Sequence, residues 1–260
     1  SGRKMSKSLG NFIAPQDLLP RYGADILRLW VASADYRDDD PISEEILARC
    51  AEAYRKIRNT ARYMLSNLYD FAPAEILPYS QLLPLDRRVL RQAREAARRV
   101  LAAYESYDFH VVYHTLLGFC TTTLSAFYLD VLKDRLYASP PDSRERRSAQ
   151  TALHRMTRML ATLTAPVLAF TAEEIWDGLP SPKEQSVHLE RFEALEDLPE
   201  DSSSDPAWDR LMKLRDEVAV ILEEARREKL IGSSLEGAIR LAGTGALARD
   251  LERAGIDPDA

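Results

Sequence analysis

The chain has 260 residues, of which 45% are hydrophobic and 29% charged, and its formal net charge is −6 at pH 7. This length can bury one good core and a second, smaller one, and the charged fraction is typical of long amphipathic helices. The sequence has no apolar run of membrane-spanning length and no charged-then-apolar export pattern, so we expect a cytoplasmic protein without a membrane partner.

Residues 1–11 form a short cationic strip, Ser-Gly-Arg-Lys-Met-Ser-Lys-Ser-Leu-Gly-Asn. Its two lysines are three residues apart, and glycine permits the backbone turns that bring such a strip against a ligand. Because lysine is a compact charge on a flexible stem, it suits a phosphate group whose charge moves during a reaction. A nucleoside triphosphate is the simplest partner, and a solvated basic tail is the alternative.

Residues 12–42 are expected to hold two short helices, one starting at Pro15 and one after Gly23. The acidic run 38–40 follows, and Pro41 breaks the chain there. Three consecutive carboxylates point in different directions on an extended chain, so we predict no metal site.

A long helix is predicted over residues 43–70, because apolar residues recur there at intervals of three and four and form one stripe. On another face, Arg55, Arg58 and Arg62 follow the same spacing. Guanidinium groups in such a row can bind the phosphates of a nucleic-acid backbone in pairs. Alternatively, they pair with acidic residues on neighbouring helices.

Further long helices are predicted over residues 85–104 and 108–137, and after Ser143. The first is the most basic window of the chain, for which phosphate contact and solvation are equally good interpretations. A last short helix is expected to start at a capping box, Thr171 to Glu174. His110 and His114 lack a third metal ligand at a useful spacing, and Cys50 and Cys120 share no metal-ligand spacing. The chain is therefore mainly all-α, a helical bundle.

The pattern changes beyond Pro180. Residues 186–190 alternate like a short strand, a helix is predicted over 206–229, and 231–241 resemble a turn entering a strand. We therefore expect a small α/β segment over 186–260, after parts at 1–42 and 43–185. Residues 1–172 hold 24 Lys/Arg against 19 Asp/Glu, and residues 173–260 hold 11 against 22. A nucleic acid should therefore contact the first two thirds of the chain.

The strip Lys4-Met5-Ser6-Lys7-Ser8, followed by Gly10-Asn11, resembles the KMSKS signature of class I aminoacyl-tRNA synthetases. Four further segments resemble the isoleucyl family and its anticodon-binding helical bundle: 23–36, 54–60, 127–137 and 165–176. The resemblance covers about residues 1–240. KMSKS alone indicates only the class, whereas the amino-acid sequence of residues 30–36 indicates the isoleucyl member.

The resemblance implies an isoleucine–tRNA ligase, which uses ATP to attach isoleucine to tRNA(Ile). It implies that Lys7 holds the key catalytic charge at the leaving pyrophosphate and that Lys4 assists. The ATP-binding residues would be Lys4, Met5, Ser6, Lys7 and Ser8, and Mg²⁺ would accompany ATP. The resemblance assigns no individual tRNA contact, so Arg55, Arg58 and Arg62 remain candidates on the basis of their spacing along the predicted helix.

The resemblance also implies what the 260 residues lack. Isoleucine would bind in a missing catalytic half, so we expect this fragment to be inactive alone. We also expect no zinc in this fragment, and a monomer. Two alternatives remain: another class I synthetase, valyl or leucyl, and a helical RNA-binding or scaffold protein without chemistry. An intact phosphate-binding lysine strip argues against the scaffold.

Overall fold

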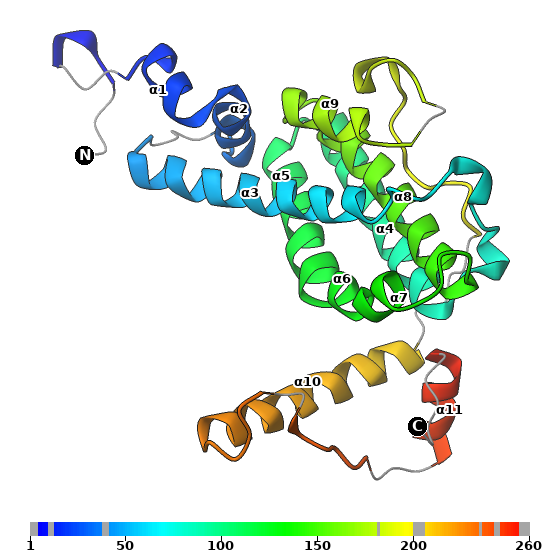
Figure 1. The fold of residues 1–260 in the computed structure, drawn as a ribbon. Coiled ribbons are helices and arrows are strands. Elements are labelled where there is room, and N and C mark those ends of the chain that lie inside the picture. Colours follow the sequence, from blue (N-terminus) through cyan, green and yellow to red (C-terminus); the bar gives the residue numbers. More distant parts are fainter. Residues whose placement is uncertain are drawn as a thin grey trace. The chain divides into compact units, whose positions relative to one another are not determined.

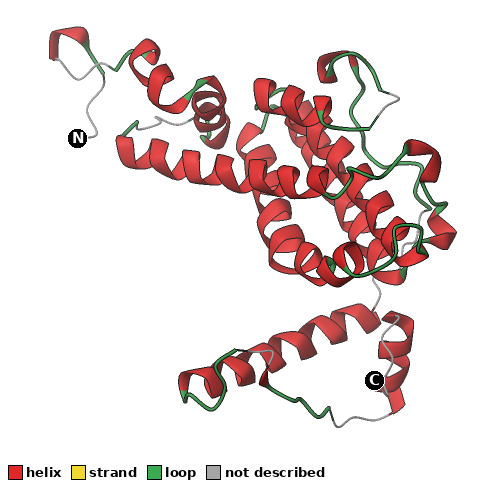
Figure 2. Cartoon of the chain, viewed as in Figure 1, coloured by secondary structure: helices red, strands yellow, loops and turns green. Residues whose placement is uncertain are grey.

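The computed structural model describes residues 5–9, 13–37, 42–180, 183–199, 206–233, 236–241 and 245–254, without the side chains of Lys7 and of residues 252–254. Every regular element in these ranges is a helix (Figures 1 and 2). The chain divides into two compact units, Ser1–Leu82 with Asp86–Leu198, and Leu83–Leu85 with Pro199–Ala260. The mainly all-α prediction is therefore confirmed.

The first unit starts with the 3-10 helix η1 (Lys7–Leu9) and the helices α1 (Pro15–Tyr22) and α2 (Ala24–Ser33). Gly23 joins the last two with φ 78, a conformation that favours glycine, and its N–H donates to the carbonyl of Leu19 at 2.9 Å. Both short helices that the sequence predicts are thus present.

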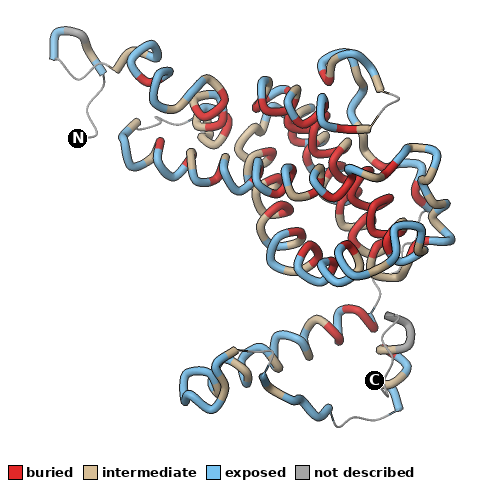
Figure 3. The backbone as a smooth tube through the Cα atoms, in the orientation of Figure 1, coloured by how far each residue is buried: buried red, intermediate tan, exposed pale blue. Residues whose placement is uncertain are grey.

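The bundle follows. Its elements are α3 (Glu44–Ser66), η2 (Pro73–Glu75), η3 (Tyr79–Gln81), α4 (Pro84–Glu105), α5 (Phe109–Gly118), the π-helix η4 (Phe119–Tyr128), α6 (Leu129–Val131), α7 (Lys133–Tyr137), α8 (Arg144–Thr164) and α9 (Ala169–Asp177). Hydroxyl caps set two of the starts, because Ser43 Oγ accepts the N–H of Ile46 and Ser143 Oγ accepts that of Arg146. Buried residues concentrate along α8 (Figure 3). Four apolar residues of α8, spaced three and four apart, are fully buried: Leu153, Met156, Leu160 and Leu163.

The helix predicted over residues 108–137 is not one regular α-helix. Its middle, η4, has the wider winding of a π-helix, a form that is rare and often found at functional sites. Thr121 Oγ1 donates to the carbonyl of Leu117 at 2.8 Å, so a side chain competes for a carbonyl within the helix. The spacing of apolar residues along the sequence could not reveal this change from α-helical to π-helical winding.

A buried polar network joins four elements of the bundle around Asp86, which is 0% exposed. Its carboxylate accepts from Tyr128 Oη at 2.7 Å, from Ser148 Oγ at 2.5 Å, and from both terminal nitrogens of Arg135 at 3.2 and 2.5 Å. Contact with this carboxylate and burial raise the pKa of Tyr128 well above its ordinary value, with burial the larger cause. The network therefore holds α4, η4, α7 and α8 together by one fully bonded charge.

The strand expected over residues 186–190 is wrong. The chain there forms the 3-10 helix η5 (Val187–Leu189). Glu173 of α9 accepts the hydroxyl of Ser186 at 2.9 Å and the N–H of Val187 at 3.0 Å, and Ser186 Oγ accepts the N–H of His188. These bonds use the backbone groups that a strand would offer to a partner.

The second unit contains α10 (Pro206–Arg227) and α11 (Gly245–Ala254). Trp208 and Leu211 form its small core, and Arg210 binds Asp250 with two bonds of 2.6 and 2.7 Å. Residues 237–241 form no strand, since the described residues offer them no strand to pair with. The predicted helix is present, but the α/β character expected for 186–260 is absent from its described part.

His154 on α8 gives the stability of the fold a defined pH dependence. Burial, with smaller contributions from Arg158 and Arg155, lowers its pKa from 6.5 to about 4. The unfolded chain therefore binds a proton at a higher pH than the folded one, and stability present above pH 6.5 is lost as the pH falls toward 4. Between pH 6.5 and 4, the native protein should lose up to about 3 kcal/mol of its free energy of unfolding through His154, and His154→Leu should not show this loss. Urea unfolding curves of the two proteins across this pH range measure the difference. Identical pH profiles for the two proteins would contradict this assignment.

Candidate functional site

The described part of the cationic strip is a short exposed turn. The N–H of Leu9 donates to the carbonyl of Ser6 at 3.2 Å, and the hydroxyls of Ser6 and Ser8 are 2.7 Å apart. Met5 and Leu9 are 44% and 62% exposed, so little of the strip is buried in this unit. Lys4 and the side chain of Lys7 lie outside what the structure describes. The hydroxyls of Ser6 and Ser8 are therefore the polar side-chain groups of the strip whose positions the structure describes.

Arg55, Arg58 and Arg62 lie in one row on the exposed side of α3. Arg55 Nε donates to the carbonyl of Ala51 at 3.2 Å, within its own helix. Arg58 is 3.6 Å from Glu174 of α9, and both side chains are exposed, which makes this a weak ion pair. Among the described residues, the guanidinium of Arg62 has no bonding partner. The row therefore presents its cationic groups largely to solvent, and within the described residues Arg58 alone of the three pairs with an acidic residue of a neighbouring helix.

The arginines of α4 are used differently, although this helix is the most basic window of the sequence. Arg94 is only 6% exposed and donates to the carbonyl of Leu198 at 2.9 Å. Arg98 binds Glu196 through two bonds of 2.9 and 2.5 Å. These residues fasten the segment before Pro199 to the bundle, so a dense run of arginines here marks intramolecular packing.

The same holds for α8. Four of its arginines bind carboxylates of other segments: Arg146 binds Asp70, Arg147 binds Glu75, Arg155 binds Asp197, and Arg158 binds Glu190. The guanidinium of Arg158 also lies over the ring of Trp176 at 4.9 Å. Of the basic rows on the described bundle helices, the row on α3 thus has the weakest intramolecular pairing.

The start of α9 links α2 to this region. Asp25 of α2 is buried and accepts the backbone N–H groups of Phe170 and Thr171 at 3.3 and 2.7 Å, and the Thr171 hydroxyl at 2.6 Å. The expected capping box at Thr171 is therefore wrong. The helix begins two residues earlier, and a carboxylate distant in sequence satisfies its first N–H groups and its dipole.

Arg28 of α2 adds to the same junction. Its guanidinium donates to the carbonyls of Pro166 and Val167 at 2.6 and 3.0 Å, where the chain passes from α8 to α9. Tyr54 of α3 also contacts Thr171, with the two hydroxyls 3.0 Å apart. The helices that follow the strip are thus fixed to the part of the bundle that carries the arginine row.

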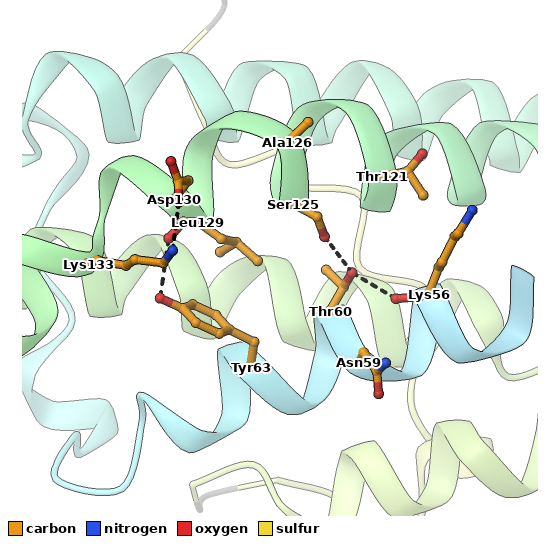
Figure 4. A pocket seen from close by; sticks show the side chains of 10 residues that line it. All are labelled: Lys56, Asn59, Thr60, Tyr63, Thr121, Ser125, Ala126, Leu129, Asp130 and Lys133. Atoms are coloured by element: carbon orange, nitrogen blue, oxygen red, sulfur yellow. Dashed lines mark hydrogen bonds and ion pairs between the residues drawn. The ribbon is translucent and has the colours of Figure 1, made fainter. Parts of the chain in front are cut away.

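A groove of about 590 Å³ runs along α3, between that helix and η4 with α6 (Figure 4). Its walls carry lysine, amide and hydroxyl groups together with apolar side chains. The lining residues are Lys56, Asn59, Thr60, Tyr63, Thr121, Ser125, Ala126, Leu129, Asp130 and Lys133. Sequence reasoning missed the groove because no motif marks it, and only the packing of α3 on η4 brings its two walls together.

Two negative findings concern the described residues alone. No group of three or more His, Cys, Asp and Glu side chains within them could hold a metal ion. None of their helices has the length and apolar character needed to cross a membrane.

Comparison with known proteins identifies two matching families. Residues 86–241 match the anticodon-binding domain of tRNA ligase, and residues 1–43 match the class I tRNA synthetases for I, L, M and V. Isoleucine–tRNA ligase of Geobacter sulfurreducens is 51% identical over 243 residues, covering 93% of this chain and 26% of the relative. That of Symbiobacterium thermophilum is 52% identical over 258 residues, covering 97% and 28%. The chain thus spans about a quarter of these relatives' length.

A solved structure shows the same fold. It is the agnB2 LeuRS of Agrobacterium radiobacter K84, in a ternary complex with tRNA and LeuAMS. The TM-score is 0.55 at 23% identity, over 73% of this chain and 22% of that one. At this identity the likeness concerns the fold alone.

Proposed function

Since this chain belongs to the family of tRNA ligase anticodon-binding domains, we propose that it is part of an isoleucine–tRNA ligase. It supplies that enzyme's tRNA-binding domain and one of its ATP-binding loops. The identity of about half to isoleucine–tRNA ligases over nearly the whole chain supports isoleucine as the amino acid. The parent enzyme acts on tRNA(Ile), ATP and isoleucine, as a cytoplasmic monomer. Isoleucine binds outside these 260 residues.

The division of labour within the chain is part of the proposal. Residues 1–42 carry the ATP loop and its connecting helices, residues 43–185 bind the tRNA, and residues 186–260 lead into a further small domain, whose compact unit starts at Pro199. The bonds of Asp25 and Arg28 to the α8–α9 junction support a rigid connection between the first two parts.

The ATP loop acts by stabilising charge. When the isoleucine carboxylate attacks the α-phosphate of ATP, the bond to pyrophosphate breaks and negative charge grows on the leaving group. A cation placed there stabilises the transition state more than the ground state, which is what accelerates the reaction. We assign this role to Lys7, with Lys4 assisting, and ATP contacts also to Met5, Ser6 and Ser8. Mg²⁺ bound to ATP would supply further positive charge at the phosphates, beside that of Lys7 and Lys4.

One observation carries the tRNA assignment: the arginines of α3 are exposed and weakly paired, whereas most of those on α4 and α8 bind their own chain. Guanidinium groups left to solvent along one helix can bind successive phosphates of a folded RNA. Arg55, Arg58 and Arg62 are therefore our candidates for tRNA contact.

The test compares two single substitutions that remove the same charge. Arg62→Ala removes a guanidinium that faces solvent, and Arg98→Ala removes one held by Glu196. We expect Arg62→Ala to weaken binding of tRNA(Ile) by roughly 5- to 30-fold, equivalent to about 1–2 kcal/mol, and Arg98→Ala to leave it nearly unchanged. Equal losses would mean that only net charge matters, and no loss in Arg62→Ala would contradict its contact with the tRNA.

A further inference from the structure

We propose that Glu174 of α9 is an internal competitor for RNA phosphate at Arg58, the central member of the arginine row of α3. The carboxylate occupies the guanidinium when no RNA is bound, and it returns to the guanidinium when a phosphate leaves. This inference rests on the tRNA-binding role proposed above and concerns its regulation. Glu174 would thereby limit how long any RNA stays bound, without selecting a nucleotide sequence.

The first argument is the position of Glu174 along α3. The hydroxyls of Tyr54 and Thr171 are 3.0 Å apart, and about one helical turn later Arg58 Nη2 lies 3.6 Å from Glu174 Oε2. The residue numbers of both contacts rise together, so α9 lies beside α3 and runs in the same direction. Glu174 therefore faces the middle of the arginine row.

The second argument is that α9 is anchored on both sides of this pair. Asp25 of α2 accepts the backbone N–H of Thr171 at 2.7 Å, and Glu173 accepts the backbone N–H of Val187 at 3.0 Å. The backbone of α9 is thus held in place, and only the side chain of Glu174 can leave Arg58. A competitor that stays attached beside its target has a high effective concentration there. It therefore rebinds each time a phosphate leaves.

The third argument is the weakness of the pair. The side chains of Arg58 and Glu174 are 45% and 67% exposed, and exposed ion pairs contribute little stability. A phosphate can bind a guanidinium through two hydrogen bonds, so it can displace the single carboxylate oxygen. Arg98, by contrast, is held by two short bonds to Glu196, which would block a phosphate more strongly. Glu174 therefore weakens phosphate binding at Arg58 and does not prevent it.

The fourth argument is that the two neighbouring acidic residues of α9 differ in use. Glu173 is half-buried and bonds the segment that follows α9, through the Ser186 hydroxyl and the Val187 N–H. Glu174 is exposed, and within the described residues its one ion-pair partner is Arg58. Glu173 thus has a structural role, whereas Glu174 is free to exchange its partner for solvent or for a phosphate.

The experiment uses the whole 260-residue chain with two RNAs, a tRNA(Ile) transcript and a folded RNA of equal length and unrelated sequence. Glu174→Gln removes the competing charge and keeps the shape of the side chain. Asp177→Asn is the matched control, because it removes the same charge from an exposed position of the same helix. Asp177 also remains near α3, since a Cβ on the adjacent Gly178 would lie 3.1 Å from a methyl of Leu65. Within the described residues it forms no ion pair with α3.

We expect Glu174→Gln to strengthen binding of both RNAs by roughly two- to fivefold, mainly through slower dissociation. The factor should be similar for both RNAs because phosphates carry no sequence information. Asp177→Asn should bind like the native chain. In a protein that already carries Arg58→Ala, adding Glu174→Gln should give no gain, because the residue for which the carboxylate competes is absent.

Three results would overturn the assignment. The first is unchanged RNA affinity in Glu174→Gln, which would leave the pair a purely structural contact between α9 and α3. The second is an equal gain in Asp177→Asn, and the third is a gain that persists in the Arg58→Ala background. Each of these last two would mean that only the net charge of α9 acts on the RNA.

The same measurements separate this inference from the function on which it depends. If Arg58→Ala weakens RNA binding but Glu174→Gln does not strengthen it, the competitor role alone fails. If Arg58→Ala leaves RNA binding unchanged, the proposed phosphate contact of Arg58 fails, and the competitor role fails with it.

Discussion

Lys7→Ala is expected to slow formation of isoleucyl-adenylate by roughly 10²- to 10³-fold in a ligase of the relatives' full length that carries these 260 residues. The ammonium would contact the departing pyrophosphate, where charge grows only as the bond breaks. Its loss should therefore lower kcat and kcat/KM together and leave the KM for isoleucine nearly unchanged. ATP–pyrophosphate exchange measures this step.

Lys213→Ala provides the matched control, because it removes an exposed lysine from α10. Its exchange rate should equal that of the native enzyme. If Lys7→Ala raises only the KM for ATP, Lys7 contributes to binding and not to the transition state. Exchange by the isolated 260 residues at a rate close to that of the full-length enzyme would show that the reaction centre lies elsewhere than we propose.

Asp86→Ala is expected to lower the free energy of unfolding by roughly 3–5 kcal/mol. The substitution leaves the Arg135 cation, 17% exposed, without its carboxylate, and it removes the acceptor of the Tyr128 and Ser148 hydroxyls. Marginal domains have about 5–15 kcal/mol in total, so the bundle would lose a large share of its stability. Urea unfolding followed by circular dichroism gives the difference.

Tyr128→Phe is the matched control for this network. It deletes a single hydrogen bond and leaves the charge of Asp86 bonded to Arg135 and Ser148. We expect a loss of only about 1 kcal/mol. A comparable loss in both variants would mean that packing around Tyr128, and not the buried charge, stabilises this part of the bundle.

Much of the fold follows from the sequence because its main determinants are local. The spacing of apolar residues predicts α3, and the serines at 43 and 143 mark helix starts that the structure confirms. The sequence-based predictions fail where a residue distant in the sequence determines the local structure. Asp25 caps α9 in place of a local capping box, and Glu173 converts an expected strand into the turn η5.

The candidate site divides in the same way. The KMSKS-like strip is a motif, and the period of Arg55, Arg58 and Arg62 places them on one face. Nothing local, however, distinguishes these arginines from Arg94 or Arg98, whose partners Leu198 and Glu196 are about 100 residues away. The groove beside α3 depends on the packing of a π-helix, and neither its winding nor its partner is visible in residue spacing.

The central claim is that the exposed arginine row of α3 binds the phosphates of tRNA. The most direct test is the salt dependence of tRNA(Ile) binding by the native chain and by the triple variant Arg55→Ala, Arg58→Ala, Arg62→Ala. Each phosphate contact releases a counterion, so we expect the plot of log affinity against log salt to become shallower by about two to three in the variant. Parallel plots for the two proteins would show that these arginines do not bind the tRNA backbone.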